Sequence, residues 1–325
     1  MASPSSWICL QSPNPTSDSV QATVALDNRG LAYGDGFFTT MGVIDGQILW
    51  QDYHQQRLDS HAHALHLGLD SHLLLASVQA HAKQLQQGML KLIVIRAAQD
   101  IRGYGYVPNT SGSACEVWLK SLPLNIATAN SLPLADGQFI PLQPAASAIC
   151  LSSQIACLPP LLAGLKSLNR LDNVLASGEL QAIKIKELAA NTELNIAEGL
   201  LRDMSGHWVE GTMSNVFYQL AEPSLSTQPM RQSLKSKSLL DNRKNNSNYL
   251  STGQWYTPSM VQSGVAGVMR QVIIDTLSTS KYPVIIRSLQ DKDLPQLSQL
   301  FFCNALRGVM PMKNLTLLSG EEVSF

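Results

Sequence analysis

The chain has 325 residues with an ordinary globular composition, enough for two domains and a substantial core. Its net charge of −1 gives no basis for binding nucleic acid or an anionic membrane, and no stretch approaches the roughly 18 consecutive apolar residues of a membrane span. The N-terminus lacks the basic segment and long apolar run of a signal peptide, and the five cysteines form no CxxC pair. Reduced thiols and a cytoplasmic location are therefore expected.

The N-terminal third of the chain alternates between strand and helix patterns. After a Ser/Pro-rich lead with one short strand, three glycines between Asp27 and Phe37 indicate a tight, irregular backbone path. Asp45-Gly46 is a strong hairpin turn, and Asp52 opens a helix. The expected elements are strands over 37–43, 47–50, 90–97 and 116–119 and helices over 52–67 and 72–87.

Four histidines lie in or beside the first of these helices. They are His54, His61, His63 and His66. Their spacing matches no standard ligand set, and no cluster of cysteines or carboxylates accompanies them. No metal site is therefore predicted.

A polar, turn-rich segment over 123–135 is the predicted linker between two domains. It separates a small N-terminal domain (1–122) from a large C-terminal domain (136–325). The C-terminal part predicts a long helix toward Leu188, a hairpin at Ser205-Gly206 and an apolar helix ending near Leu277. Its expected strands lie near 139–142, 148–152, 198–203, 208–210, 216–220, 284–286 and 300–306.

Residues 221–253 differ in composition from the sequence on either side. Ser, Asn, Gln, Lys and Arg dominate there, which predicts a solvated, mobile insertion in a hairpin loop. An RNA-contacting loop would need interleaved aromatic residues, which are nearly absent. The insertion is therefore not assigned a nucleic-acid partner.

Lys166 is the first candidate for chemistry. It follows Ala-Gly and precedes a run in which Leu168, Leu171, Val174 and Leu175 are spaced for one apolar helix face. Burial at the entry of such a helix would lower the pKa of the lysine and make it an amine nucleophile. On this stretch alone, a solvated lysine beside an ordinary amphipathic helix is the more frequent case, because most lysines are solvated.

Three further elements fit the same chemistry. Glu210 is a carboxylate at a strand end, the turn from Gly264 to Gly267 opens a helix and offers free N–H groups to an anion, and Arg57 is a possible bidentate phosphate partner. An amine, a carboxylate and an anion site are what a protein needs to hold pyridoxal 5′-phosphate (PLP). Motifs of the commonest alternatives, GxGxxG, GxxxxGK[ST], HExxH and GxSxG, are absent.

The local sequence of these elements resembles that of the fold-type IV PLP enzymes and, within them, that of the 4-amino-4-deoxychorismate lyases. The similar segments cover nearly the whole chain except the first 20 or so residues and the insertion. They are 27–40, with Arg29-Gly30 and Gly34-Asp35-Gly36; 164–171, with Lys166-Ser167-Leu168-Asn169-Arg170-Leu171; 210–217; and 264–270, supported by His54…Arg57-Leu58, Arg102-Gly103-Tyr104 and Cys303-Asn304-Ala305-Leu306.

The resemblance implies an α/β (α+β) fold with a smaller N-terminal α/β domain and a larger C-terminal domain built on a barrel-like sheet. The cofactor would lie between the two, and a homodimer is expected. The resemblance makes Lys166 the internal aldimine and later the proton-transfer base, and it pairs Glu210 with the pyridine nitrogen. The phosphate would be held by Arg57, the backbone of Val265 and Ala266, and the turn at Asn304 and Ala305.

The reaction implied is conversion of 4-amino-4-deoxychorismate, a small-molecule substrate, to 4-aminobenzoate and pyruvate for folate synthesis. Lys166 would remove the proton on the carbon bearing the amine, and Thr39 or Thr40 would assist the leaving group as an acid. Arg102, with Tyr104 beside it, would bind a substrate carboxylate.

Alternative functions remain open. Branched-chain or D-amino-acid aminotransferases share the fold, but commonly place a glutamate near the position of Thr39, so the threonine favours the lyase. A non-catalytic binding protein of the same fold is a second alternative, against which the intact Lys166 and Glu210 argue. A hydrolase using Ser or Cys lacks its nucleophile motif.

Overall fold

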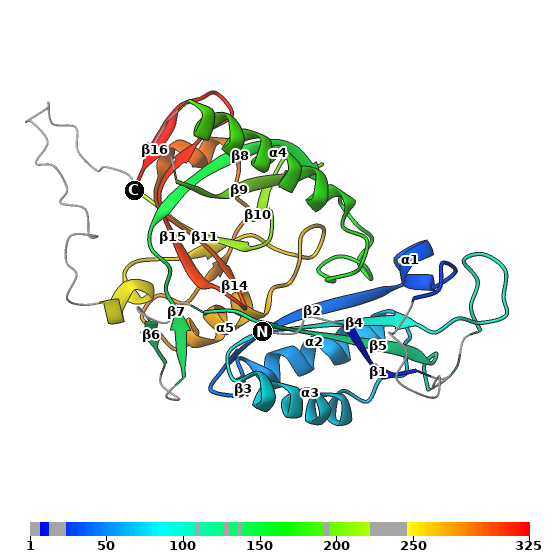
Figure 1. The fold of residues 1–325 in the computed structure, drawn as a ribbon. Helices are drawn as coiled ribbons and strands as arrows, with labels where there is room; N and C mark the ends of the chain where they lie inside the picture. The colour runs from blue at the N-terminus through cyan, green and yellow to red at the C-terminus, as the bar shows by residue number, and fades with distance from the viewer. Residues whose placement is uncertain are drawn as a thin grey trace, which may run out of the picture.

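A computed structural model describes residues 7–12, 24–107, 109, 111–126, 131–134, 138–190, 195–221 and 246–325. Figure 1 shows two layers of structure that meet along strand β2, a smaller N-terminal sheet with two helices and a larger C-terminal barrel. The expected fold class, a smaller α/β domain and a larger barrel domain, is confirmed.

The N-terminal sheet has five antiparallel strands in the order β1-β5-β4-β2-β3. Helices α2 (Gln51–Ala64) and α3 (Ser71–Leu85) cover one face, and their apolar residues form one core with that face. The strands are β1 (Trp7–Gln11), β2 (Gly36–Ile44), β3 (Gln47–Ile48), β4 (Gly88–Arg96) and β5 (Cys115–Pro123). The short helix α1 (Arg29–Tyr33) precedes β2.

Local sequence explains how these elements begin and end. Asp45 (φ 51°) and Gly46 (φ 70°) are both left-handed, as a two-residue hairpin between β2 and β3 requires. Asp70 caps α3 by accepting a hydrogen bond from the N–H of Leu73 at 2.9 Å. The predicted strand 47–50 is shorter than expected, because Trp50 takes a left-handed conformation and starts α2.

The C-terminal sheet closes into a barrel. Six strands follow one another in the order β10-β9-β8-β15-β14-β11, and a further pairing of β11 with β10 completes the ring. These strands are β8 (Ala146–Ile155), β9 (Ile196–Asp203), β10 (Trp208–Gly211), β11 (Asn215–Leu220), β14 (Leu297–Asn304) and β15 (Gly308–Thr316). Aromatic and aliphatic side chains, including Trp208, Tyr218 and Phe302, fill the core of the sheet.

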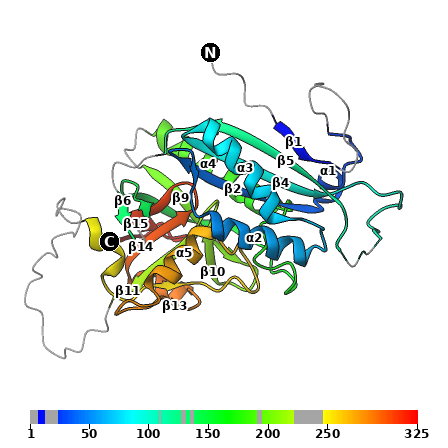
Figure 2. The same cartoon turned by 90° about the horizontal axis from the view of Figure 1, so that it is seen from below.

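The remaining elements lie around this barrel. Helix α4 (Leu171–Ala189) packs outside β8, and α5 (Val268–Leu277) packs against β14 and lies beside α2 (Figure 2). Short strands β12 (Tyr256–Thr257), β13 (Ile285–Ile286) and β16 (Glu322–Ser324) extend the sheet, and β6 (Ser131–Pro133) pairs with β7 (Phe139–Pro141). Two 3-10 helices, η2 (Asn246–Ser251) and η3 (Asp291–Gln296), complete the described chain.

The end of the predicted insertion is more ordered than its composition suggests. Residues 222–245 lie outside the described residues, but η2 follows them and Leu250 is buried. The indole of Trp255 donates a hydrogen bond to the carbonyl of Leu250 at 3.0 Å, and the Tyr249 ring packs against Trp255. The prediction of a solvated segment as far as residue 253 is therefore wrong for its last residues, because two apolar side chains anchor them to the core.

The apolar face predicted after Lys166 does not face the core. Leu171, Val174 and Leu175 are 78%, 60% and 71% exposed, whereas Ala176 and Leu180 are the buried residues of α4. The spacing correctly indicated a helix, but it could not say which side of that helix meets the barrel. Ala176 and Leu180 lie on the side of α4 that packs against β8 and β9.

Two absences hold for the part of the chain that the structure describes. No helix there is both long and apolar enough to cross a membrane. Within the same residues, no three His, Cys, Asp or Glu side chains gather in a way that could hold a metal ion. Residues 127–130 and 135–137 of the predicted linker region lie outside the description, so the boundaries 122 and 136 stay a prediction.

Candidate active site

The segment that carries Lys166 is paired with the edge of the N-terminal sheet. The N–H of Phe38 donates to the carbonyl of Lys166, and the N–H of Leu168 donates to the carbonyl of Gly36, both at 3.0 Å. Gly36 has no room for a side chain between β4 and Leu168, since a Cβ there would lie 2.2 Å from the carbonyl oxygen of Val94 and 3.1 Å from Leu168 Cδ1. A lysine of the C-terminal half is therefore fixed to β2.

Two more groups hold the backbone around Lys166. Its own N–H donates to Nε2 of His61, on α2, at 2.9 Å. The guanidinium of Arg170 donates to the carbonyl of Leu165. The peptide groups on both sides of Lys166 thus have fixed partners from three elements, α2, β2 and the start of α4.

The amine of Lys166 lies over an aromatic ring in a partly buried position. Its Nζ is 4.6 Å from the ring centroid of Phe38. Burial and the positive charge of Arg57 lower the pKa of Lys166 to about 7, although the carboxylate of Glu210 acts in the opposite direction. A large fraction of this lysine is therefore unprotonated at neutral pH, as a nucleophilic amine must be.

Glu210 supplies a buried carboxylate to the same cluster. Its Oε2 accepts a hydrogen bond from the N–H of Val265 at 2.8 Å, and its Oε1 accepts one from Asn173 Nδ2 at 3.4 Å. Burial raises the pKa of Glu210, and the nearby charges of Arg170 and Lys166 counteract this. The sequence-predicted amine and carboxylate thus lie close enough for each to affect the pKa of the other.

Arg57 links the N-terminal helices to the first turn of α5. Its Nη2 donates to the carbonyl of Ala266 at 2.7 Å, and its side chain is buried. Burial lowers the pKa of Arg57 to about 10, which leaves the guanidinium charged at neutral pH. The N–H groups of Gly267, Val268 and Met269 donate no hydrogen bond to a described residue, so a cation and a helix N-terminus offer one combined anion site.

Val265 and Ala266 do not offer the N–H groups that the sequence prediction gave them. The N–H of Val265 is bonded to Glu210, and that of Ala266 donates to the carbonyl of Gly164 at 2.9 Å. Asn215 holds the same turn from the barrel, because its Nδ2 donates to the carbonyl of Val265 at 2.8 Å. The backbone groups without a partner come one to three residues later, at the start of α5.

Asn304 and Ala305 form a turn that faces β2. Oδ1 of Asn304 accepts hydrogen bonds from the N–H groups of Leu306 (3.1 Å) and Arg307 (2.8 Å), which closes the turn between β14 and β15. A Cβ on Gly42 of β2 would lie 3.5 Å from the carbonyl of Ala305. The turn therefore lies along the face of β2 that also carries Thr40.

The two candidate threonines point to opposite faces of β2. Thr39 is fully buried, with its Oγ1 2.8 Å from Nδ1 of His54 and 3.5 Å from Nη1 of Arg57. Because side chains alternate along a strand, Thr40 shares its face with Phe38, the ring beneath the Lys166 amine. Of the two, Thr40 is the one on the side of the lysine.

Arg102 and Tyr104 are exposed, and no described contact brings either side chain to Lys166. Their loop is nevertheless firmly held. The buried guanidinium of Arg29 donates to the carbonyls of Gly103, Tyr104 and Gly105, and both Arg29 and Arg96 bind one carboxylate oxygen of Asp35, at 2.8 and 2.9 Å. This explains the Arg29 and Asp35 of the glycine-rich motif as anchors of the loop.

Several site residues were missed by sequence reasoning. His61, Arg170 and Asn173 all touch the Lys166–Glu210 cluster, and His54 touches Thr39. One signal was available: His54, Arg57 and His61 are spaced i, i+3, i+7 and therefore share one face of a helix. The histidines were weighed as metal ligands, and His54 also as part of the family resemblance, whereas a face shared with Arg57 indicated a common site.

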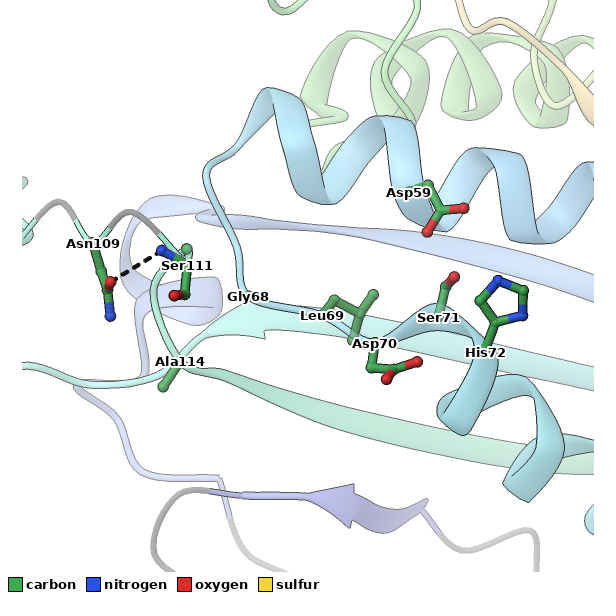
Figure 3. A pocket seen from close by; sticks show the side chains of 10 residues that line it. Asp59, Gly68, Leu69, Asp70, Ser71, His72, Asn109, Ser111 and Ala114 are labelled. Atoms are coloured by element: carbon green, nitrogen blue, oxygen red, sulfur yellow. Dashed lines mark hydrogen bonds between the residues drawn. The ribbon is translucent and has the colours of Figure 1, made fainter.

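A cavity of about 660 Å³ opens elsewhere, on the outward side of α2 (Figure 3). It lies between Asp59 of α2, the start of α3 and the loop from Asn109 to Ala114, and the Ser71 side chain points toward Asp59. None of the sequence-predicted site residues lines it. It is therefore separate from the Lys166 cluster.

Comparison with known proteins shows the family and the fold to which this site belongs. The family model described as amino-transferase class IV matches residues 36–315. Aminodeoxychorismate lyase of Vibrio harveyi is 24% identical over 299 residues, covering 91% of this chain and 89% of the relative. The crystal structure of 4-amino-4-deoxychorismate lyase from Pseudomonas aeruginosa superposes with a TM-score of 0.66 at 27% identity, covering 90% and 88% of the two chains.

A second similar structure is described as having the cofactor bound. It is the PLP-bound form of a hypothetical aminotransferase from Mycobacterium tuberculosis, with a TM-score of 0.62, 17% identity and coverage of 98% and 93%. At that identity the likeness shows the fold alone. The family model matches most of this chain, and the lyase structure from Pseudomonas aeruginosa has a similar fold. The chain therefore belongs to the class IV aminotransferase family, whose members are PLP-dependent enzymes of fold type IV.

Proposed function

We propose that this protein is a PLP-dependent lyase that converts 4-amino-4-deoxychorismate to 4-aminobenzoate and pyruvate. One observation carries the proposal: a partly buried lysine with its pKa lowered to about 7 lies in one cluster with a buried carboxylate. A buried arginine adjoins the same cluster, at the N-terminus of α5. The lyase names of the two relatives described above support the choice of reaction.

The residues of the cluster fit PLP. Lys166 would carry the cofactor, Glu210 would pair with its ring nitrogen, and Arg57 with the first turn of α5 would hold its phosphate. Two buried polar atoms beside Glu210, Arg170 Nε and Asn173 Oδ1, have no hydrogen-bond partner among the described residues, as expected of a site completed by a bound group. When bound, the cofactor supplies an electron sink for the charge that proton removal leaves behind.

The protein's own groups would then act in a fixed order. Once the substrate amine has replaced Lys166 on the cofactor, the unprotonated Lys166 amine would take the proton from the substrate carbon that bears the amino group. Its place over the Phe38 ring keeps it partly out of water. The carboxylate of Glu210 stabilises positive charge on the ring nitrogen. Thr40, on the Lys166 side of β2, is our candidate for the hydroxyl that assists the departing enolpyruvyl oxygen.

Lyase chemistry is favoured over transamination by the side chain at position 39. Thr39 is neutral, buried and bonded to His54, so it places no carboxylate beside Arg57. An aminotransferase acting on branched-chain or D-amino acids is the second candidate, because a solved branched-chain amino acid aminotransferase has a similar fold. It would require a second substrate half-reaction that returns the amino group to a keto acid.

The remaining predictions from the resemblance stay proposals. They are a role in folate synthesis, a cytoplasmic homodimer, the phosphate contact of the Asn304-Ala305 turn, and Arg102 and Tyr104 as carboxylate-binding residues. For the last pair, the anchored loop supports only that the backbone is preorganised. Replacing Arg102 with leucine should raise KM for the substrate while leaving cofactor binding intact.

The first experiment tests the cofactor. Purified protein mixed with PLP should develop a visible absorption band, and borohydride reduction followed by peptide mass spectrometry should find the cofactor on Lys166. A chain that takes up no cofactor would refute the proposal and support a non-catalytic protein of this fold.

The second experiment separates the two enzyme candidates. Enzyme with PLP and aminodeoxychorismate, without a keto acid, should release 4-aminobenzoate and pyruvate through many turnovers. A protein that instead transfers amino groups between branched-chain or D-amino acids and 2-oxoglutarate, and releases no 4-aminobenzoate, would be the aminotransferase.

A further inference from the structure

We propose that His61 is a positioning residue for the Lys166 amine, acting as a neutral hydrogen-bond acceptor for the Lys166 backbone. The inference rests on the proposed function only in the role it gives to Lys166. The contact itself joins two residues 105 positions apart, from α2 and from the loop before α4, through Lys166 N and His61 Nε2 at 2.9 Å.

The surroundings of His61 fix both its place and its tautomer. The side chain is buried, and its ring meets the Phe37 ring edge-on at 5.3 Å between centroids. Because Nε2 accepts from Lys166, the ring proton must lie on Nδ1, which is 3.2 Å from Ser60 Oγ. The Ser60 hydroxyl in turn donates to the carbonyl of Arg57 at 3.1 Å. Every polar atom of this short chain therefore has a consistent partner.

Burial and the charges around His61 keep it neutral. Arg57 from the same helix, Arg170 from the start of α4 and Lys166 from its own loop all face the ring, and each disfavours a second proton. Together with burial they lower the pKa of His61 to about 3. The acceptor at Nε2 is thus present throughout the pH range in which an enzyme of this kind works.

This contact decides where the lysine side chain can go. The Lys166 N–H is held by His61, and its carbonyl accepts from the N–H of Phe38 at 3.0 Å. With both peptide groups fixed, the side chain leaves the backbone in one direction, over the Phe38 ring. Without the acceptor, the Lys166 N–H would be buried without a hydrogen-bond partner. The free-energy cost of that would favour a shift of the loop that exposes the N–H to water. The amine would then become more solvated, and its pKa would rise toward that of a free lysine.

The test compares three variants in the full-length chain freed of cofactor. His61→Leu removes the acceptor, His61→Gln offers a carbonyl oxygen in its place, and His63→Leu alters an exposed histidine two positions along the same helix. The rate of Lys166 acetylation by trace acetic anhydride, followed against pH by peptide mass spectrometry, reports the pKa of this one amine. This measurement does not depend on cofactor, substrate or turnover.

The wild type and His63→Leu should give a Lys166 pKa near 7, and His61→Gln should stay close to it. His61→Leu should move the pKa to about 8 or higher, which slows acetylation at pH 7 about fivefold or more, because the unprotonated fraction falls from about a half to about a tenth. If His61→Leu does not fold, His61→Met, a more adaptable side chain with only a weak acceptor, makes the same comparison. A folded variant without the acceptor whose Lys166 profile matches the wild type would overturn the proposal and leave His61 a packing residue.

The result is distinguishable from a failure of the proposed function. If Lys166 carries no cofactor but its pKa follows the identity of residue 61, the positioning role stands and the lyase proposal falls. If the cofactor binds to Lys166 and the acetylation profile ignores residue 61, the lyase proposal stands and the positioning role falls.

Discussion

Glu198 and Glu210 are both buried carboxylates on neighbouring barrel strands, yet their surroundings are opposite in character. Glu198 accepts hydrogen bonds from the N–H groups of Gly199 and Thr212 and from the hydroxyls of Thr212 and Ser214, between 2.5 and 3.0 Å. Glu210 has two neutral donors, one of them at 3.4 Å, and shares its surroundings with Lys166 and Arg170.

The difference separates a carboxylate that holds the fold from one that is available to a ligand. The four donors of Glu198 belong to its own strand and to the turn after Glu210, so its side chain is fully hydrogen-bonded and holds that turn in place. Glu210 accepts few hydrogen bonds for a buried carboxylate, so its charged form is destabilised and its pKa is raised. Such destabilised groups are typical of functional sites.

Thr39 and Thr40 of β2 offer a similar comparison in the N-terminal sheet. Thr39 is bonded to His54 within the buried layer between β2 and α2, whereas Thr40 lies on the face that carries the Lys166 amine. Glu198 and Glu210 form one pair of identical side chains, and Thr39 and Thr40 form another. Within each pair the two side chains have different surroundings, so substituting each member in turn tests whether the surroundings decide its role.

The largest expected effect is on Glu210. Glu210→Gln keeps the shape but removes the charge that would face the cofactor nitrogen, so turnover should fall about a thousandfold while the protein stays folded. Steady-state release of 4-aminobenzoate, with circular dichroism as the folding control, measures this. Wild-type turnover in the variant would remove Glu210 from the proposed mechanism.

Thr40 should come next. Thr40→Val removes a hydroxyl near the proposed leaving group and should lower kcat by about a hundredfold with little change in cofactor affinity. Thr39→Val should instead cost about 1–3 kcal/mol of stability, because Nδ1 of the buried His54 loses its partner. If Thr39→Val lowered kcat more than Thr40→Val, the assignment of the two faces would be reversed.

Glu198 should affect stability rather than chemistry. Glu198→Gln turns an acceptor of four hydrogen bonds into a group that also donates, so the free energy of unfolding should fall by about 2–3 kcal/mol. Urea denaturation measures the loss. Turnover per folded molecule should remain near that of the wild type, and a collapse of turnover in a stably folded variant would contradict the contrast with Glu210.

The pH dependence of stability should reveal the buried charge of Glu210. A raised pKa means that folded Glu210 holds its proton more tightly than the unfolded chain does, so ionising it above that pKa costs stability. Cofactor-free Glu210→Gln should therefore have a higher Tm than wild type at pH 7, and the gap should close as the pH falls toward 4.5. A gap independent of pH would show that the charge of Glu210 is not the cause.

The smallest effect is expected at Asn173. Its amide donates to Glu210 over 3.4 Å, a long hydrogen bond, so Asn173→Ala should lower kcat only a few-fold. A pH–rate profile is the informative readout, since loss of this donor should raise the pKa of Glu210 further. A profile identical to the wild type would leave Asn173 a packing residue.

Sequence reasoning reached the fold because its signals are local or depend on the order of motifs. The Asp45-Gly46 turn and the apolar strand predicted over 90–97, which is 88–96 in the structure, follow from a few adjacent residues. Lys166, Glu210 and Arg57 were grouped through the order of their motifs, and the structure brings them into one cluster.

What the sequence could not supply is direction. Leu171 and Leu175 form an apolar stripe whichever side of α4 meets the barrel, and Thr39 and Thr40 are equivalent until the covered face of β2 is known. The contact of His61 with Lys166 depends on where α2 passes the loop before α4, which no local pattern encodes. The N–H groups of Val265 and Ala266 were misassigned because their partners, Glu210 and Gly164, are distant in sequence.

The pairing of residues 166–168 with β2 has a consequence for motion. Lys166 lies in the C-terminal half of the sequence, yet its peptide carbonyl and N–H are bonded to Phe38 and His61 of the N-terminal half. If the two layers rock apart to admit a substrate, either these bonds break or the lysine travels with the N-terminal sheet while Glu210 stays with the barrel. Opening would then lengthen the separation between amine and carboxylate, so the strength of the nucleophile would vary with the degree of closure.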